Sequence, residues 1–288
     1  MPDLDDLLKR DTALPALPQI YIEVSQLLDD PDSSAEEIGA AVQMEPSITS
    51  RILKMVNSAY YGLNRPVSSI TQTVAMIGTA RLKQILFGSI LAGLFKPPGA
   101  TPLKVEEFWR HSVMTAIIAR HLAMQNARII DHDELFTAGL LHDIGRLIIA
   151  IQMPSAFNEI QRLITEQQVE TLEAEKRVLG FDHTLVSEAL LQSWGLPRLL
   201  VHCVRQHHNT EHGGALEIPG SIIYLANRLS QLEKPLKEDE AEKLVREIPA
   251  WEKTRCTIEQ IGVGWGLAED QAYEVMIAYG LIDDDSPI

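Results

Sequence analysis

Hydrophobic residues recur with the period of an α-helix along almost the whole chain. No segment alternates apolar and polar residues as a half-buried strand does. Residues 18–30, for example, place Ile20, Val24 and Leu28 on one stripe of a helix. The pattern therefore predicts an all-α protein, and the chain of 288 residues is long enough to bury a sizeable core.

Several residues predict where helices begin. Ser33 with Glu36, or Ser34 with Glu37, can form a capping box, and Pro46 suits the first position of the next helix. Gly62 can take a positive φ after that helix ends.

Other residues predict where helices end. Residues 96–102 contain three prolines and cannot continue a helix, and Gly78 divides residues 70–95 into two helices. The pattern over residues 134–151 is unbroken and predicts one helix. We expect a two-lobe helical bundle with an N-terminal lobe over residues 1–98, a second helical lobe over 99–232 and an acidic helical extension over 233–288.

Composition excludes some classes of protein. The net charge is −15, of which −8 lies in residues 233–288, so a nucleic-acid partner is not expected. Cys203 and Cys256 do not indicate a disulfide framework. The first residues lack the apolar core of a signal peptide, and the best apolar run, residues 84–95, is too short to span a membrane. We expect a cytoplasmic protein without a membrane partner.

The histidines are unevenly placed, because all nine lie between His111 and His212. His142–Asp143 follows a run of small and apolar residues, where an unpaired charge would be costly to bury. His111 shares a helical face with Phe108 and Met114. An imidazole and a carboxylate from separate helices can build a metal site, although a hydrogen-bonded core histidine would show the same pattern as His111.

Three further histidines lie at predicted helix ends. His183 follows Asp182 at a helix start, and His207 and His208 end a helix, where a protonated imidazole interacts favourably with the carbonyl dipoles. Each of these could be a cap instead of a ligand. The remaining histidines are interpreted as structural or solvated: His121, His132, His202 and His212.

In combination and order, several motifs resemble the HDOD domains, which are relatives of the HD phosphohydrolase superfamily. The motifs occupy residues 14–18, 44–47, 53–62 and 70–78 in the first lobe, and 108–112, 139–145, 180–183, 194–197 and 207–208 in the second. The resemblance covers most of the chain, to about residue 232. It implies an all-helical, two-lobe bacterial cytoplasmic protein, in a family whose members mostly act in regulation without demonstrated catalysis.

The HD superfamily resemblance also implies a set of metal ligands. The superfamily uses a His, then His-Asp, then a later Asp, and the matching positions here are His111, His142, Asp143 and Asn227. Asn227 offers a neutral oxygen in place of a carboxylate, which weakens the site. Two histidines and one carboxylate can still hold a divalent transition metal of the Fe or Mn type.

The related HD-GYP phosphodiesterases differ from this chain at further positions. Where they carry a Lys, a Glu and a Gly-Tyr-Pro loop, this chain has Arg146, Asn209 and residues 211–214 without that loop. The resemblance therefore implies that three histidines are remnants of a second metal site, and no catalytic residue is assigned. These histidines are His183, His207 and His208.

Two functions follow as hypotheses. The first is a non-catalytic signal-transduction module that acts through a signalling protein partner, or through a nucleotide or another small-molecule ligand. The alternative is a metal-dependent phosphohydrolase or phosphodiesterase of the HD superfamily. In the first lobe, residues 57–62 could form a partner surface, but a helix C-cap with packed tyrosines is the preferred interpretation.

Overall fold

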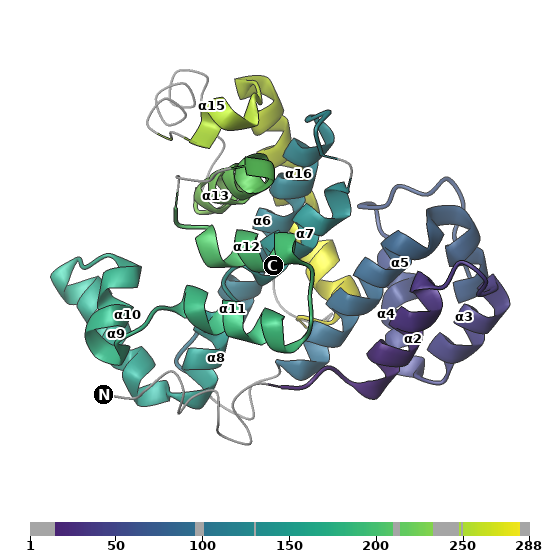
Figure 1. Cartoon of the computed structure of the whole chain (residues 1–288), viewed down its shortest axis with the longest axis horizontal. Helices are drawn as coiled ribbons and strands as arrows, with labels where there is room; N and C mark the ends of the chain where they lie inside the picture. Colours follow the sequence, from purple (N-terminus) through teal and green to yellow (C-terminus); the bar gives the residue numbers. More distant parts are fainter. Residues whose placement is uncertain are drawn as a thin grey trace. The chain divides into compact units, whose positions relative to one another are not determined.

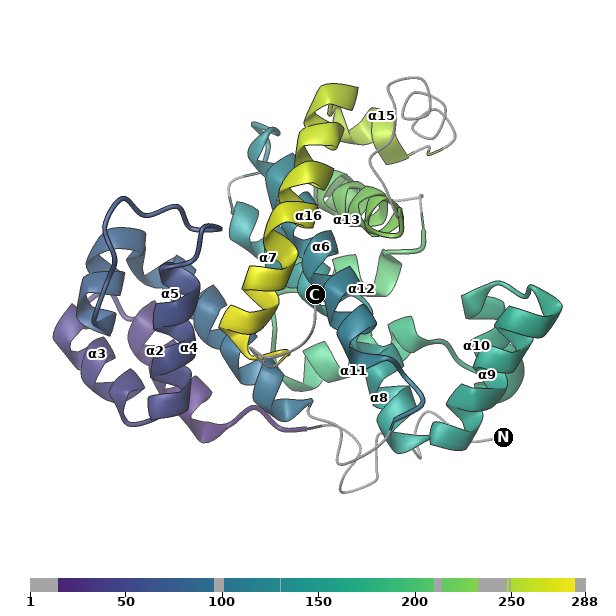
Figure 2. The same ribbon diagram turned by 180° about the vertical axis from the view of Figure 1, so that it is seen from behind.

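The computed structural model describes residues 15–95, 101–129, 131–209, 214–232, 248 and 250–282. Within these ranges all regular elements are helices, which confirms the predicted all-α fold (Figures 1 and 2). Contacts divide the chain into two compact units, and each is described by itself. Unit 1 comprises Met1–Pro15 and Pro97–Ala268, and unit 2 comprises Ala16–Lys96 and Glu269–Ile288.

Unit 2 contains α2 (Gln19–Asp29), α3 (Ala35–Gln43), α4 (Pro46–Val56), α5 (Ile70–Leu94) and the end of α16 (Ile258–Tyr279). Of the two predicted capping boxes, α3 uses the one formed by Ser34 and Glu37. The Glu37 amide donates to Ser34 Oγ at 3.2 Å, while the Ser34 amide donates to Glu37 Oε2 at 2.8 Å. Pro46 is the first residue of α4, as predicted.

Helix α5 is interrupted at Gly78, where φ is 82° and ψ is 167°, so the predicted division into two helices is confirmed. Among the described residues, α5 is the one helix whose length and hydropathy would allow it to cross a membrane. The sequence had shown no apolar run of that length. Because Gly78 breaks the helix, the longer uninterrupted part, 79–94, is shorter than the ~20 residues of a typical membrane span.

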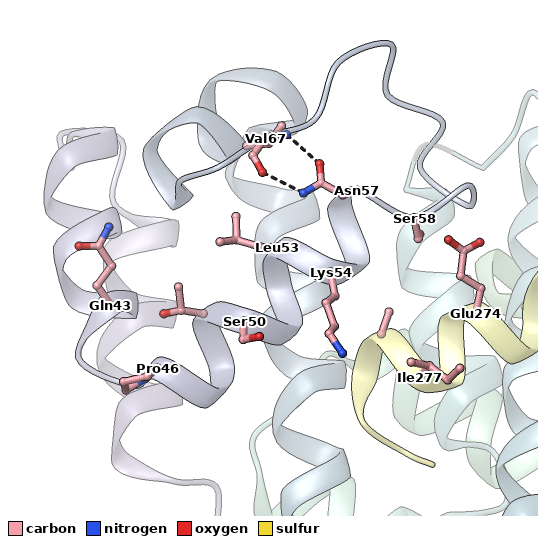
Figure 3. A pocket seen from close by; sticks show the side chains of 12 residues that line it. Gln43, Pro46, Ser50, Leu53, Lys54, Asn57, Ser58, Val67, Glu274 and Ile277 are labelled. Carbon is pink, nitrogen blue, oxygen red and sulfur yellow. Dashed lines mark hydrogen bonds between the residues drawn. The ribbon is translucent and has the colours of Figure 1, made fainter. Parts of the chain in front are cut away.

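The end of α4 is fixed by one side chain. Asn57 Nδ2 donates to the Val67 carbonyl at 2.8 Å, and the Val67 amide donates to Asn57 Oδ1 at 2.7 Å (Figure 3). Gly62 lies between these two residues with the expected positive φ of 59°. This double bridge gives the 57–62 segment a structural role; its use as a partner surface stays an untested hypothesis.

A groove of about 850 Å³ lies beside this bridge, within unit 2. Its walls come from α4 and from the last turns of α16, and Lys54 and Glu274 are among the lining residues (Figure 3). Glu274 Oε1 also accepts a hydrogen bond from the Ala59 amide at 3.0 Å.

Unit 1 holds the remaining elements. These are α6 (Val105–Met124), α7 (His132–Leu141), α8 (Ile144–Gln152), α9 (Pro154–Gln167), α10 (Thr171–Leu179), α11 (His183–Ser193), α12 (Arg198–Gln206), η1 (Gly214–Leu216), α13 (Glu217–Ser230), α15 (Ala250–Thr254) and the first part of α16. Helix α6 packs against both α7 and α13, α11 packs against α8 and α12, and α9 pairs with α10.

One expectation about this part of the chain needs correction. The single helix predicted over residues 134–151 is broken into α7 and α8 at His142–Asp143. The expected extension 233–288 is divided by its contacts, with 250–268 in unit 1 and 269–282 in unit 2. The rest of that extension, the linker residues 96–100 and His212 lie outside the described residues. The functional division into 1–98, 99–232 and 233–288 stays a prediction.

Candidate metal centre

The break between α7 and α8 places His142 and Asp143 inside unit 1, and two glycines make the close packing possible. A Cβ on Gly139 would lie 2.6 Å from the Cα of Ala116 on α6, and a Cβ on Gly145 would lie 2.1 Å from the His183 carbonyl oxygen. The Gly145 amide also donates to Ser187 Oγ at 2.8 Å. The two helices can therefore approach α6 and α11 only because both positions lack a side chain.

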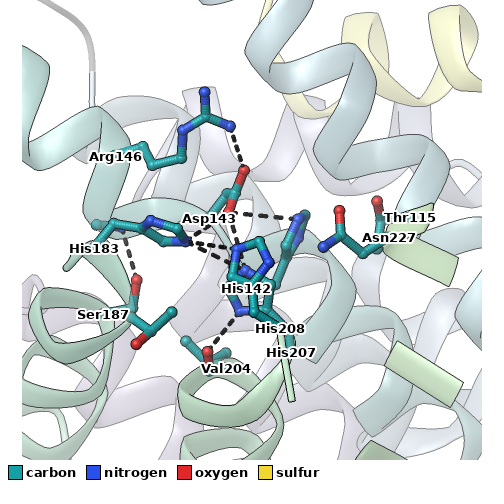
Figure 4. Close-up of polar contacts among 12 residues, drawn as sticks. Thr115, His142, Asp143, Arg146, His183, Ser187, Val204, His207, His208 and Asn227 are labelled. Atoms are coloured by element: carbon teal, nitrogen blue, oxygen red, sulfur yellow. Dashed lines mark hydrogen bonds and ion pairs between the residues drawn. The ribbon is translucent and has the colours of Figure 1, made fainter. Parts of the chain in front are cut away.

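The structure brings six of the seven predicted ligand positions together around Asp143. His183 begins α11, and His207 and His208 follow the end of α12 (Figure 4). Four candidate ligand atoms from Asp143, His183, His207 and His208 lie within 4.8 Å of one another, and we call them the His183 group. A second set with the same spacing consists of His111, His142 and Asp143, and we call it the His111 group.

Asn227, the seventh predicted position, is buried on α13 and faces His111, with which its side chain forms a hydrogen bond. Its Oδ1 atom also accepts from Gln231 Nε2 at 3.3 Å. Its amide therefore serves neighbouring side chains, and its place among the metal ligands stays a prediction. Among the histidines interpreted as structural, the described ones, His121, His132 and His202, lie outside both groups.

The tautomers of three histidines are fixed by partners on the side away from Asp143. Nδ1 of His142 lies 2.7 Å from the Gly139 carbonyl, and Nδ1 of His207 lies 2.7 Å from the Val204 carbonyl. Nδ1 of His183 lies 2.7 Å from the Glu175 carboxylate. Because these oxygens accept, each Nδ1 donates, and each neutral imidazole keeps a lone pair on Nε2. Metal-ligating histidines are held in this way.

Three electron-rich atoms consequently face one another in the His183 group. Asp143 Oδ1 lies 3.2 Å from His183 Nε2 and 3.2 Å from His207 Nε2, and the two nitrogens are 3.3 Å apart (Figure 4). With neutral imidazoles none of these contacts holds a hydrogen atom. The triangle therefore requires a cation, either a proton on His183 or a metal ion.

The size of this triangle fits a metal. Nitrogen ligands bind Zn²⁺ at about 2.0–2.1 Å, so two such ligands lie about 2.8–3.4 Å apart when the angle at the metal is between a right angle and the tetrahedral angle. All three observed separations, 3.2, 3.2 and 3.3 Å, fall in this range. His208 Nε2, 3.3 Å from His183 Nε2, supplies a fourth donor from the exposed side.

The His111 group differs, because it offers three candidate ligand atoms where the His183 group offers four. His111 Nε2 lies 3.1 Å from His142 Nε2, and His111 Nδ1 lies 3.0 Å from the Ser230 hydroxyl. The Ser230 hydroxyl donates its one proton to the Asn227 carbonyl at 2.9 Å, so Nδ1 of His111 donates to the hydroxyl oxygen, and the Nε2 atoms of His111 and His142 face each other as lone pairs. With one ligand more, the His183 group is the stronger of the two candidate sites, and the sequence had suggested it to be the remnant.

Electrostatics keep the carboxylate ionised. Burial acts to raise the pKa of Asp143, but the imidazole of His142, the Arg146 guanidinium and the imidazoles of His183 and His207 hold that pKa well below the usual range. Arg146 Nη1 donates to Asp143 Oδ2 at 2.8 Å. The two carboxylate oxygens thus have separate roles, with Oδ1 directed to the His183 group and Oδ2 to the arginine.

The histidines respond to the same environment. Burial lowers the pKa of His111 and lowers that of His142 well below the usual value. Burial also acts to lower the pKa of His183, but the Glu175 and Asp143 carboxylates outweigh it and raise that pKa to about 9. In the absence of a metal, His183 therefore carries the cation of the triangle at neutral pH.

Sequence reasoning missed Glu175, which orients His183 and also accepts from its amide at 2.9 Å. A signal was present, because Glu175 lies four residues before Leu179 on the same face of α10, and both are buried. An acidic residue on an apolar stripe indicates a buried partner. Ser230, beside His111, had no comparable signal.

Comparison with known proteins decides the family. The model of the HDOD domain matches residues 14–210, more than half of the chain. The chain belongs to the HDOD family. A crystal structure of an HDOD domain protein of unknown function from Geobacter sulfurreducens is similar over 93% of both chains, with 25% identity and a TM-score of 0.75.

Other relatives agree with the HDOD fold. A candidate phosphohydrolase from Shewanella amazonensis has a TM-score of 0.78 at 22% identity, and the similarity covers 96% of this chain and 98% of that one. An uncharacterized protein of Treponema pallidum is 25% identical over 199 residues, which are 69% of this chain. The chain spans 38% of the length of that curated relative.

The close approach of α8 to α11 can be tested at Gly145. We expect Gly145→Ala to lower the free energy of unfolding by about 1–3 kcal/mol, because the added methyl group meets backbone atoms. Gly262→Ala on α16 is the matched control, because an added Cβ there would meet no atom within 4 Å. The greater helix propensity of alanine should raise the free energy of unfolding by up to about 1 kcal/mol. Urea unfolding measures the free energy of unfolding of both variants, and equal changes in the two would contradict the packing argument.

The proton on His183 can be tested through metal binding. Since the pKa of His183 is about 9, we expect metal binding at pH 7 to release about one proton from that ring. Affinity should then rise about tenfold per pH unit up to about pH 9. Titration calorimetry in buffers of different ionisation enthalpy measures the release. Binding without proton release would show that the metal does not occupy the triangle.

Proposed function

We propose that this HDOD protein is a regulatory module that binds one divalent transition metal in the His183 group and does not act as an enzyme. The observation that carries the proposal is the triangle of Asp143 Oδ1, His183 Nε2 and His207 Nε2, whose separations match those of atoms that share one metal ion. Three imidazoles and a carboxylate suit an ion of the Fe or Mn type, and zinc shares these preferences.

A metal in this position would act mainly on structure. Its ligands come from the start of α8, the start of α11 and the end of α12, so binding would tie three helix ends together. Because the ligands are assembled only in the folded chain, binding free energy adds to the stability of unit 1. When bound, the ion would also supply Lewis acidity to any water or ligand that reached it.

Three features favour regulation over hydrolysis. Asp143, His183 and His207 are buried, with at most 3% exposed surface, which leaves little room for a reacting water between them. One oxygen of Asp143 is paired with Arg146. Asn227 replaces the later carboxylate of the HD enzymes and so removes a negative charge from the His111 group.

A specific observation supports the second candidate, a metal-dependent phosphohydrolase. A pocket of about 440 Å³ within unit 1 is lined by His111 and Arg146, so a small molecule could reach the edge of the centre. The fold is also shared with the candidate phosphohydrolase of Shewanella amazonensis. In the regulatory proposal the same pocket admits a nucleotide or another small ligand, and the output passes to a signalling protein partner in the cytoplasm.

Metal content tests the proposal directly. Protein purified without chelator should contain about one equivalent of transition metal by mass spectrometry, and His183→Ala should lose it together with several degrees of melting temperature. His132→Ala is the matched control, because His132 begins α7 outside both groups. Wild-type protein that takes up no metal would refute the proposed function.

Turnover separates the two candidates. The metal-loaded protein is assayed with cyclic dinucleotides and nucleoside phosphates, beside His142→Ala and His132→Ala. We expect no hydrolysis above the rate of the metal-free protein. Turnover that disappears in His142→Ala and persists in His132→Ala would instead establish the phosphohydrolase.

A further inference from the structure

We infer that Arg146 stands in for a second metal ion, and that an oxyanion in the adjacent pocket recruits that second ion to the His111 group. The inference deepens the proposed function and rests on it, since the first ion occupies the His183 group. It assigns a ligand class to the pocket and a regulatory role to the arginine.

The first step concerns the charge that Arg146 neutralises. The ion pair between Arg146 Nη1 and Asp143 Oδ2 measures 2.8 Å, while His111 Nε2 lies 3.8 Å from the same oxygen. Asp143 Oδ1 faces His183 and His207 and lies 3.7 Å from His142 Nε2, so Oδ2, on the His111 side, is the oxygen left for a metal in the His111 group. The guanidinium therefore supplies the positive charge that a second ion would bring, and the two cations compete for one oxygen.

The second step concerns the other side of Arg146. Its side chain is 27% exposed and lines the pocket of about 440 Å³ together with His111. Phe108 and Phe157 also line this pocket, as do Lys104 and Glu107, which form an ion pair with each other at 2.7 Å. A guanidinium recognises oxyanions, because Arg binds phosphate or carboxylate groups in a bidentate manner. The phenylalanines offer apolar contact to an organic body, so the pocket suits a small oxyanionic metabolite.

The third step joins the two sites. An oxyanion bound to Arg146 draws the guanidinium away from Asp143 Oδ2 and adds negative charge beside His111. Both effects favour a cation between His111, His142 and Asp143, where two Nε2 atoms already lie 3.1 Å apart. Anion and second metal should therefore bind with positive coupling, and the coupling must be reciprocal.

The experiment uses Mn²⁺ with inorganic phosphate, at constant ionic strength maintained with chloride. Equilibrium dialysis should give about one Mn²⁺ per chain in chloride and about two in phosphate. Phosphate should in turn bind at least about fivefold more tightly when Mn²⁺ is present. A nucleoside monophosphate and acetate, tested in parallel, show whether the pocket selects an organic body and whether carboxylate suffices.

Arg146→Gln removes the internal cation, so this variant should bind two Mn²⁺ per chain without phosphate. Arg162→Gln is the matched control, because Arg162 pairs with Glu159 and Glu166 on α9 and does not line the pocket; it should behave as the wild type. If Arg146→Gln does not fold, the Mn²⁺ stoichiometry of the wild type in chloride and in phosphate still tests the inference.

The possible failures are distinguishable. Wild-type protein that binds no Mn²⁺ in either medium would refute the proposed function itself. One Mn²⁺ per chain in both media, together with one in folded Arg146→Gln, would leave the proposed function intact and overturn the role of Arg146. A stoichiometry of two in chloride would also overturn it, because the arginine would then not exclude the second ion.

Discussion

The buried carboxylate of Asp143 is the constraint on which the rest of unit 1 depends. It lies where α7 ends and α8 begins, has five imidazoles around it and is paired with Arg146 (Figure 4). A buried charge must be compensated, because desolvation of an isolated carboxylate is costly. The helices that carry these groups therefore have to meet at one point, and the glycines at 139 and 145 allow the backbones to approach closely enough.

Around this carboxylate, a second layer of partners determines what the histidines can do. Carbonyls of Gly139 and Val204 and the Glu175 carboxylate take the Nδ1 protons, so the Nε2 lone pairs point inward. The His183 group offers four ligand atoms to one cation, whereas the His111 group offers three and shares Asp143 with Arg146. This contrast favours one metal in the His183 group and a second only when Arg146 is displaced.

Much of this could be predicted from the sequence, because helix period and capping are local properties. The all-α fold, the capping box at Ser34 and the interruption at Gly78 were all predicted from residues close in the chain. The break at His142–Asp143 was missed, since the apolar pattern runs through it and only packing against α6 and α11 imposes it.

The order of importance of the two histidine groups could not be predicted either. It depends on which oxygen of Asp143 the arginine occupies and on where each Nδ1 proton goes, and both are set by residues distant in sequence. Glu175, eight residues before His183, shows the limit well: its place on an apolar stripe indicates a buried partner but does not identify the partner.

Anomalous diffraction tests the central claim most directly, with crystals of protein purified without chelator and data collected at the absorption edge of the metal found. The account predicts one strong peak, about 2.0–2.3 Å from His183 Nε2, His207 Nε2 and Asp143 Oδ1. It predicts no peak between His111 and His142 while Arg146 stays paired with Asp143. A peak only at the His111 group, or none at the triangle in protein shown to contain metal, would contradict it.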